Sequence, residues 1–88
     1  MVIWKYKLET CGQTLIEVPR GAQCLHVGLI DDEPYVWCYV DELSKDMVIM
    51  NIFVMETGAQ FRFTFQIQHI GTVQFADGTV FHYFRKPN

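Results

Sequence analysis

The sequence predicts an all-β fold: a compact small sandwich or partly open barrel of about seven mainly antiparallel strands in a single domain, residues 1–88. Three observations lead to this prediction. Apolar and polar residues alternate with a period of two along most of the chain, turn residues interrupt the alternation about every eight to twelve residues, and no segment has helical periodicity. A chain of 88 residues is long enough for one domain and no more.

Two short strands are expected first. Residues 2–8 alternate aromatic with lysine side chains, so the two faces of this segment differ. A turn at Gly12 leads into residues 14–18. Pro19 stops this second strand, because proline has no N–H group for a ladder hydrogen bond.

The next two strands are expected to form a hairpin. Residues 22–30 and 33–41 flank Asp31 and Asp32, and aspartate is accepted at the positive φ angles of a two-residue turn. A turn at this point gives one face three apolar pairs: Leu25 with Cys38, Val27 with Val36, and Leu29 with Pro34. We expect this face to belong to the core.

Residues 47–55 and 61–68 predict two further strands. The first segment is apolar on both faces, which is typical of a central strand that is covered on both sides. The second alternates phenylalanine and isoleucine with polar residues, as a strand with one buried face does.

The chain ends in a predicted hairpin centred on Asp77 and Gly78. An Asp-Gly pair favours a two-residue type I′ turn, whose twist matches that of the flanking strands. A turn centred there pairs Val80 with Phe75, His82 with Val73, and Phe84 with Gly71. This register places His82 on the core-facing side, and Phe81 and Tyr83 on the opposite, mixed face.

Composition and charge limit the function classes. Half of the residues are hydrophobic and 15% are aromatic, so we expect part of the aromatic surface to be buried in a homo-oligomer, most simply a two-fold dimer. A formal charge of −3 gives no electrostatic footprint for direct nucleic-acid binding. Three cysteines without paired spacing favour reduced thiols in a cytoplasmic compartment. We expect no signal peptide at the start of the chain, and no apolar run of the sequence is long enough to span a membrane.

Few residues have the spacing of a catalytic or metal site. Cys24 and His26 share a face of their predicted strand, but a zinc site needs three or four converging ligands, and the predicted register turns Cys38 away from His26. No basic cluster flanks a cysteine to activate it, and no carboxylate pair has a spacing for acid–base catalysis. We therefore expect no metal, no cofactor and no enzymatic activity.

The first candidate binding surface lies on the hairpin of residues 22–41. It is the face that does not carry the three apolar pairs. Its expected residues are one histidine, three aromatic residues and the two turn residues at the rim: His26, Tyr35, Trp37, Tyr39, Asp31 and Asp32. Aromatic side chains around a histidine suit a stacking platform for a base, or a hot-spot patch for a protein partner. The alternative is that this face is the second half of the core, covered by another layer of strands.

The second candidate surface is the mixed face of the C-terminal hairpin. It carries Phe81, Tyr83 and Arg85. Arginine and tyrosine are enriched at the centres of interfaces, although a sheet face open to water carries them as well. Tyr83 and Arg85 are therefore included among the candidate binding residues.

Several blocks of the sequence resemble a small uncharacterised protein family that is common in bacteriophage and prophage genomes. In order along the chain, the blocks are Trp4-Lys5-Tyr6, Ile16-Glu17-Val18-Pro19-Arg20-Gly21-Ala22, Leu25-His26-Val27, Pro34-Tyr35-Val36-Trp37-Cys38-Tyr39-Val40-Asp41, His69-Ile70-Gly71-Thr72-Val73-Gln74 and Val80-Phe81-His82-Tyr83-Phe84. The resemblance implies a viral origin and expression in the host cytoplasm. It brings no established activity and no site residues.

Together these observations lead us to expect a phage-encoded, non-catalytic binding protein that neutralises a host defence or regulatory factor by stoichiometric binding. One alternative is an oligomeric sponge that sequesters a nucleotide signal. Another is a small structural or assembly protein of the virion. The expected partner is a host protein or a small nucleotide ligand, and neither a nucleic-acid strand nor a membrane.

Overall fold

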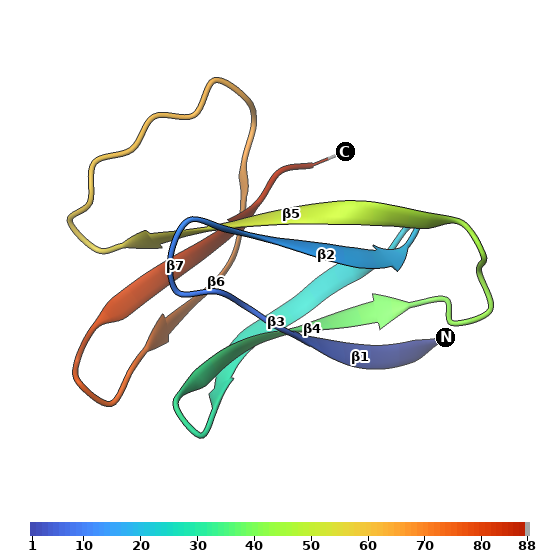
Figure 1. Cartoon of the computed structure of the whole chain (residues 1–88), viewed down its shortest axis with the longest axis horizontal. Helices are drawn as coiled ribbons and strands as arrows, with labels where there is room; N and C mark the ends of the chain where they lie inside the picture. Colours follow the sequence, from blue (N-terminus) through green and yellow to red (C-terminus); the bar gives the residue numbers. More distant parts are fainter. Residues whose placement is uncertain (88) are drawn as a thin grey trace.

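Seven strands form two antiparallel sheets in residues 1–87, the part of the chain that the computed structural model describes. The strands are β1 (Val2–Lys7), β2 (Gln13–Pro19), β3 (Gln23–Ile30), β4 (Glu33–Val40), β5 (Met47–Glu56), β6 (Gln68–Gln74) and β7 (Val80–Arg85). One sheet has the order β1-β4-β3 and the other β2-β5-β7-β6, and the sheets do not close into a barrel (Figure 1). The predicted all-β fold is confirmed. No helix long and apolar enough to cross a membrane occurs among these residues.

The two sheets share one hydrophobic core between their inner faces. Alternate residues of β4 from Val36 to Val40, and of β5 from Met50 to Val54, lie in this core, because side chains alternate between the two faces of a strand. The buried hydrophobic residues are Leu8, Ile16, Val18, Ala22, Val27, Val36, Cys38, Val40, Met50, Ile52, Val54, Val73 and Tyr83. The sheets approach each other most closely at β3 and β6.

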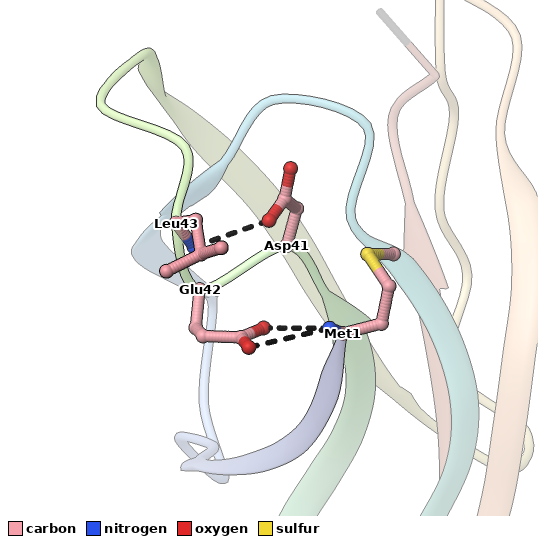
Figure 2. A network of polar contacts seen from close by, with 4 residues as sticks. All are labelled: Met1, Asp41, Glu42 and Leu43. Carbon is pink, nitrogen blue, oxygen red and sulfur yellow. Dashed lines mark hydrogen bonds and ion pairs between the residues drawn. The ribbon is translucent and has the colours of Figure 1, made fainter.

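The start of β1 is held against the loop between β4 and β5. The N-terminal ammonium group of Met1 lies 2.9 Å from a carboxylate oxygen of Glu42, and the backbone N–H of Leu43 donates to the Asp41 carboxylate at 3.1 Å (Figure 2). A hydrogen bond from the ammonium group lowers the pKa of the Glu42 carboxyl. Exposed ion pairs contribute little to stability. The contact between Met1 and Glu42 instead helps to position the start of β1 beside the end of β4, its partner in the sheet.

The β3–β4 hairpin has the predicted turn, with one change in register. Asp31 and Asp32 have φ angles of 51° and 62°, as a two-residue type I′ turn requires, and Val27 pairs with Val36 as expected. A β-bulge between Cys24 and His26 then adds one residue to β3, so that Cys24 lies opposite Cys38. The predicted pairing of Leu25 with Cys38 is therefore wrong, and Leu25 is an exposed residue.

The register predicted for the C-terminal hairpin is wrong by one residue. The backbone N–H of Gly78 donates to the Phe75 carbonyl at 2.9 Å, and the N–H of Phe75 donates to the Thr79 carbonyl at 2.8 Å. This pattern, with Gly78 at a φ of 90°, is a three-residue loop that ends in a glycine bulge. Because side chains alternate, the slip exchanges the two faces: Tyr83 is fully buried, and His82 pairs with Thr72 on the outside.

The strand predicted over residues 61–68 is a loop as far as residue 67. This segment belongs to the connection between β5 and β6, and it lays two phenylalanines, Phe63 and Phe65, over the outer side of β5. The ring centroids of Phe63 and Phe65 lie 5.2 and 5.6 Å from that of Phe53. Strand β5 is thus covered on both faces near Phe53, as expected, whereas Ile49 is 54% exposed.

An exposed aromatic face as the candidate functional site

Three aromatic residues of β4 point away from the core, and together with His26 of β3 they form what we call the aromatic face: His26, Tyr35, Trp37 and Tyr39. Strand β4 is the central strand of its sheet, and its even-numbered residues are buried. The odd-numbered residues of β4 must therefore point outward. Tyr35 and Trp37 are half-buried by their neighbours, and Tyr39 is 39% exposed. No strand layer covers this face within residues 1–87, so the alternative of a second core half is wrong for this part of the chain.

The rings of the aromatic face contact one another. The His26 and Trp37 ring centroids are 5.7 Å apart, and those of Tyr35 and Trp37 are 6.3 Å apart, both pairs with tilted planes. Gly28 leaves room for this arrangement, because a Cβ atom there would lie 2.8 Å from Nε2 of His26. Such contacts hold the rings in defined positions before any partner binds.

Strand β1 adds a cation and an apolar side chain beside the aromatic face. Lys5 lies opposite Trp37, and its Nζ is 5.2 Å from the centroid of the Tyr35 ring, within the range of a cation–π contact. Ile3 lies opposite Tyr39 and is 57% exposed. The face therefore combines rigid aromatic area with one positive charge and an apolar margin.

The two aspartates predicted at the rim have different environments. Both lie at the tip of the β3–β4 hairpin and are exposed. The Asp32 carboxylate accepts a hydrogen bond of 2.8 Å from the backbone N–H of Ala76, which belongs to the loop between β6 and β7. Asp32 thus connects the tips of two hairpins that are far apart in the sequence. Asp31 lies at the rim of the face, as predicted.

The second predicted surface does not exist in the expected form. Tyr83 is fully buried, and its hydroxyl donates to the backbone carbonyl of Glu9 at 2.9 Å. Burial raises the pKa of Tyr83 to about 12. The physical reason for the error is the one-residue slip of the hairpin, which turns Tyr83 and its face neighbour Arg85 towards the inside of the sandwich.

Arg85 instead lines a cavity of about 350 Å³ between the ends of strands in the β2-β5-β7-β6 sheet. Met50 and Val48 form part of its apolar wall, and the exposed side chains of Arg20 and Gln68 stand at its margin. The Nε atom of Arg85 is buried and has no hydrogen-bond partner among the described residues. Sequence reasoning missed this cavity, because it is built by residues from β2, β5, β6 and β7 that no local pattern connects.

The grouping of Cys24 with His26 on one face was also wrong. The bulge turns Cys24 to the inner face, next to Cys38, while His26 stays on the aromatic face opposite Trp37. Among residues 1–87 no three histidine, cysteine, aspartate or glutamate side chains are grouped so as to hold a metal ion.

Comparison with known proteins gives a family and no more. No curated protein and no solved structure matches the chain. A family model described as a domain of unknown function, DUF7352, matches residues 1–88, which is the whole chain. By its sequence, this protein therefore belongs to the DUF7352 family.

Proposed function

We propose that this protein is a non-catalytic binding protein and that a protein partner docks on the aromatic face. The observation that carries the proposal is the row of Tyr35, Trp37 and Tyr39 on the outer side of a central strand, accessible to solvent within residues 1–87. Tyrosine and tryptophan are enriched among the residues that supply most of the binding energy at protein interfaces.

The position of the row in the sheet supports the same proposal. Strand β4 is hydrogen-bonded to β1 on one side and to β3 on the other, so its backbone has little freedom. Aromatic side chains on such a strand lose little conformational entropy when a partner covers them. A stable, stoichiometric complex is what this arrangement favours.

We further propose that the protein is encoded by a bacteriophage, acts in the host cytoplasm, and neutralises a host defence or regulatory factor by occupying it. The support is the resemblance of the sequence blocks, such as Pro34-Tyr35-Val36-Trp37-Cys38, to a phage and prophage family. A small acidic β domain with an exposed aromatic face suits neutralisation by binding, because this mode of action needs contact area and no chemical step.

Replacing Trp37 by alanine is expected to weaken binding by at least about 2 kcal/mol, or about 30-fold in Kd, because the substitution removes the central ring of the aromatic face. The partner would first be captured from host lysate on immobilised wild-type protein and identified by mass spectrometry. The Kd of the purified partner would then be measured by titration calorimetry. Leu15→Ala is the matched control, since Leu15 is 59% exposed on the other sheet.

Thermal unfolding of each variant separates loss of binding from loss of folding. Equal affinity of the folded Trp37→Ala variant and the wild type would contradict the proposal. An equal loss of affinity in the Leu15→Ala variant would move the docking surface to the other sheet. A co-purifying small molecule that absorbs ultraviolet light, and that Trp37→Ala no longer retains, would favour the nucleotide sponge. The contact of Lys5 with Tyr35 is the feature that suits this second function, because a lysine beside a stacking ring fits a phosphate beside a base.

We also expect the isolated protein to form a homo-oligomer, most simply a two-fold dimer that buries part of its exposed aromatic surface. Sedimentation equilibrium at high micromolar concentration is then expected to give about twice the chain mass of 10.3 kDa. The Tyr39→Ala variant is expected to shift the equilibrium towards monomer if the aromatic face forms the contact. A strictly monomeric wild type would contradict this prediction and would leave the aromatic face free for a different partner.

A further inference from the structure

The β-bulge in β3 places two cysteines directly opposite each other. Cys24 and Cys38 are partners across the antiparallel β3 and β4 strands, and both are free thiols. Cα atoms of opposite residues in an antiparallel pair lie about 4.5–5.5 Å apart, and a disulfide accepts Cα separations of about 4.4–6.8 Å. Both side chains belong to the inner face. The register therefore places the two cysteines in the range of Cα separations that a disulfide accepts.

The surroundings of Cys24 favour its thiolate form. Cys24 Sγ lies 3.4 Å from Met50 Sδ, and Arg85 of β7 is close enough to act on the sulfur. Hydrogen bonding with Cys38 lowers the pKa of Cys24 to about 7; burial opposes this shift, and the positive charge of Arg85 adds to it. The same hydrogen bond, together with burial and the Cys24 charge, raises the pKa of Cys38. Of the two sulfurs, Cys24 therefore has the greater tendency to ionise.

A cavity lies beside this pair of cysteines, next to the neighbours of Cys24. Met50 and Arg85, the two neighbours of Cys24, also line the cavity of about 350 Å³ whose margin includes the exposed Arg20 and Gln68. Cys24 is itself only half-buried, whereas Cys38 is fully buried behind it. Of the two sulfurs, that of Cys24 is therefore the more accessible to a reagent in solution.

We propose that Cys24 and Cys38 are a reactive dithiol, in which Cys24 attacks a low-molecular-weight disulfide such as oxidised glutathione and Cys38 resolves the product into a cross-strand disulfide. This site is on the inner face, opposite to the aromatic face, and it is independent of the proposed docking function. Reactive cysteines of this kind combine a low-pKa, accessible thiol with a neighbouring resolving thiol.

The reaction has two exchange steps. The Cys24 thiolate attacks one sulfur of oxidised glutathione, the S–S bond of glutathione breaks, and one glutathione thiolate leaves. The sulfur of Cys38 then attacks Cys24 Sγ, its proton passes to the departing second glutathione, and the protein disulfide forms. Once Cys24 is in the mixed disulfide its negative charge is gone, so two of the causes that raise the pKa of Cys38 are removed as well. In sum, two protein thiols are oxidised and one glutathione disulfide is reduced to two thiols.

The test is treatment of the folded protein with oxidised glutathione, followed by alkylation of the remaining thiols and intact-mass analysis. Of the three cysteines, wild type is expected to keep one alkylatable thiol, the exposed Cys11, and to lose two hydrogen atoms without gaining glutathione. The Cys38→Ser and Cys38→Ala variants are expected to stop at the mixed disulfide, with one glutathione on Cys24. The Cys11→Ser variant is the matched control and is expected to form the disulfide like wild type.

A further variant tests the role of the arginine. Arg85→Gln is expected to slow the modification of Cys24 by about threefold or more at neutral pH, because less of the thiol is ionised. Retention of three alkylatable thiols in folded wild type, or glutathione attached to Cys11 alone, would overturn the proposal. So would disulfide formation that occurs only after unfolding in denaturant, since the strand register would then play no part.

Discussion

The Gly71→Ala variant is expected to lose about 3 kcal/mol or more of its free energy of unfolding, at the upper end for an overpacked core site. Gly71 of β6 lies against Val27 of β3, where the two sheets approach each other most closely. A Cβ atom at Gly71 would lie 2.5 Å from Cβ and 2.8 Å from Cγ2 of Val27. Because the Cβ of Val27 is fixed to the backbone, no rotamer relieves this contact, and the sheets must move apart.

Chemical and thermal unfolding measure this effect, and the melting temperature is expected to fall by more than about 10 °C. Gly28→Ala is the matched control. Gly28 is also a glycine inside a strand, β3, and its new Cβ would also lie 2.8 Å from a neighbouring atom. That neighbour is the Nε2 atom at the end of the exposed His26 side chain, which can rotate away. The control is therefore expected to stay within about 1 kcal/mol of wild type.

A double-mutant cycle identifies the atoms responsible. Val27→Gly removes the Cβ that clashes, so it is expected to cost less in the Gly71→Ala background than in wild type. Val27→Ala keeps that Cβ and removes only the contact with Cγ2, so it is expected to give less relief than Val27→Gly. Similar stability of the Gly71→Ala and Gly28→Ala variants would show that the two sheets do not meet at Gly71 as closely as described.

The fold class was predictable because it depends on a local property. Alternation with a period of two and frequent turn residues require only neighbouring residues, and the Asp31-Asp32 turn was found in the same way. The bulge at Leu25 was not predictable, because no glycine or other local signal marks it. It exchanges Leu25 for Cys24 on the inner face, and the cysteine pair depends on that exchange.

The C-terminal hairpin shows how one residue decides a face. Asp77-Gly78 suits a two-residue turn, and it equally suits the last two positions of a three-residue loop that ends in a glycine bulge. The observed register pairs Val73 with Phe81 on the inside and Thr72 with His82 on the outside, which separates apolar from polar residues better than the predicted one. Weighing both registers by this separation would have placed Tyr83 in the core from the sequence.

The candidate site was predictable in part for a similar reason. The alternation along β4 indicated that Tyr35, Trp37 and Tyr39 share a face, and the structure shows that they do. Whether a second layer covers that face depends on packing between distant segments, so the sequence left both possibilities open. The alternating phenylalanines from Phe61 were misleading for the same reason: a loop that lies on an apolar sheet has the pattern of a strand.

Truncation of Tyr83 to alanine is expected to cost about 3–5 kcal/mol of unfolding free energy, as for other large aromatic residues in a core. Tyr83 is fully buried on β7, and its ring fills the space between the inner faces of the sheets. The more informative variant is Tyr83→Phe, which keeps the ring and removes only the hydroxyl that donates to the Glu9 carbonyl at 2.9 Å. Loss of this donor is expected to cost about 1–3 kcal/mol if the carbonyl finds no other partner.

The pH dependence of Tyr83→Phe separates the hydrogen bond from packing. Burial raises the pKa of Tyr83 from 10.0 to about 12, so the hydroxyl stabilises the folded state fully below pH 10. As the pH rises from 10 towards 12, the unfolded chain ionises first, and this stabilisation is lost. Urea unfolding between pH 7 and pH 11 is therefore expected to show the advantage of wild type over Tyr83→Phe shrinking only above pH 10. A constant difference across this range would mean that Tyr83 ionises equally easily in the folded and unfolded states, and hence that it is not sealed inside the core.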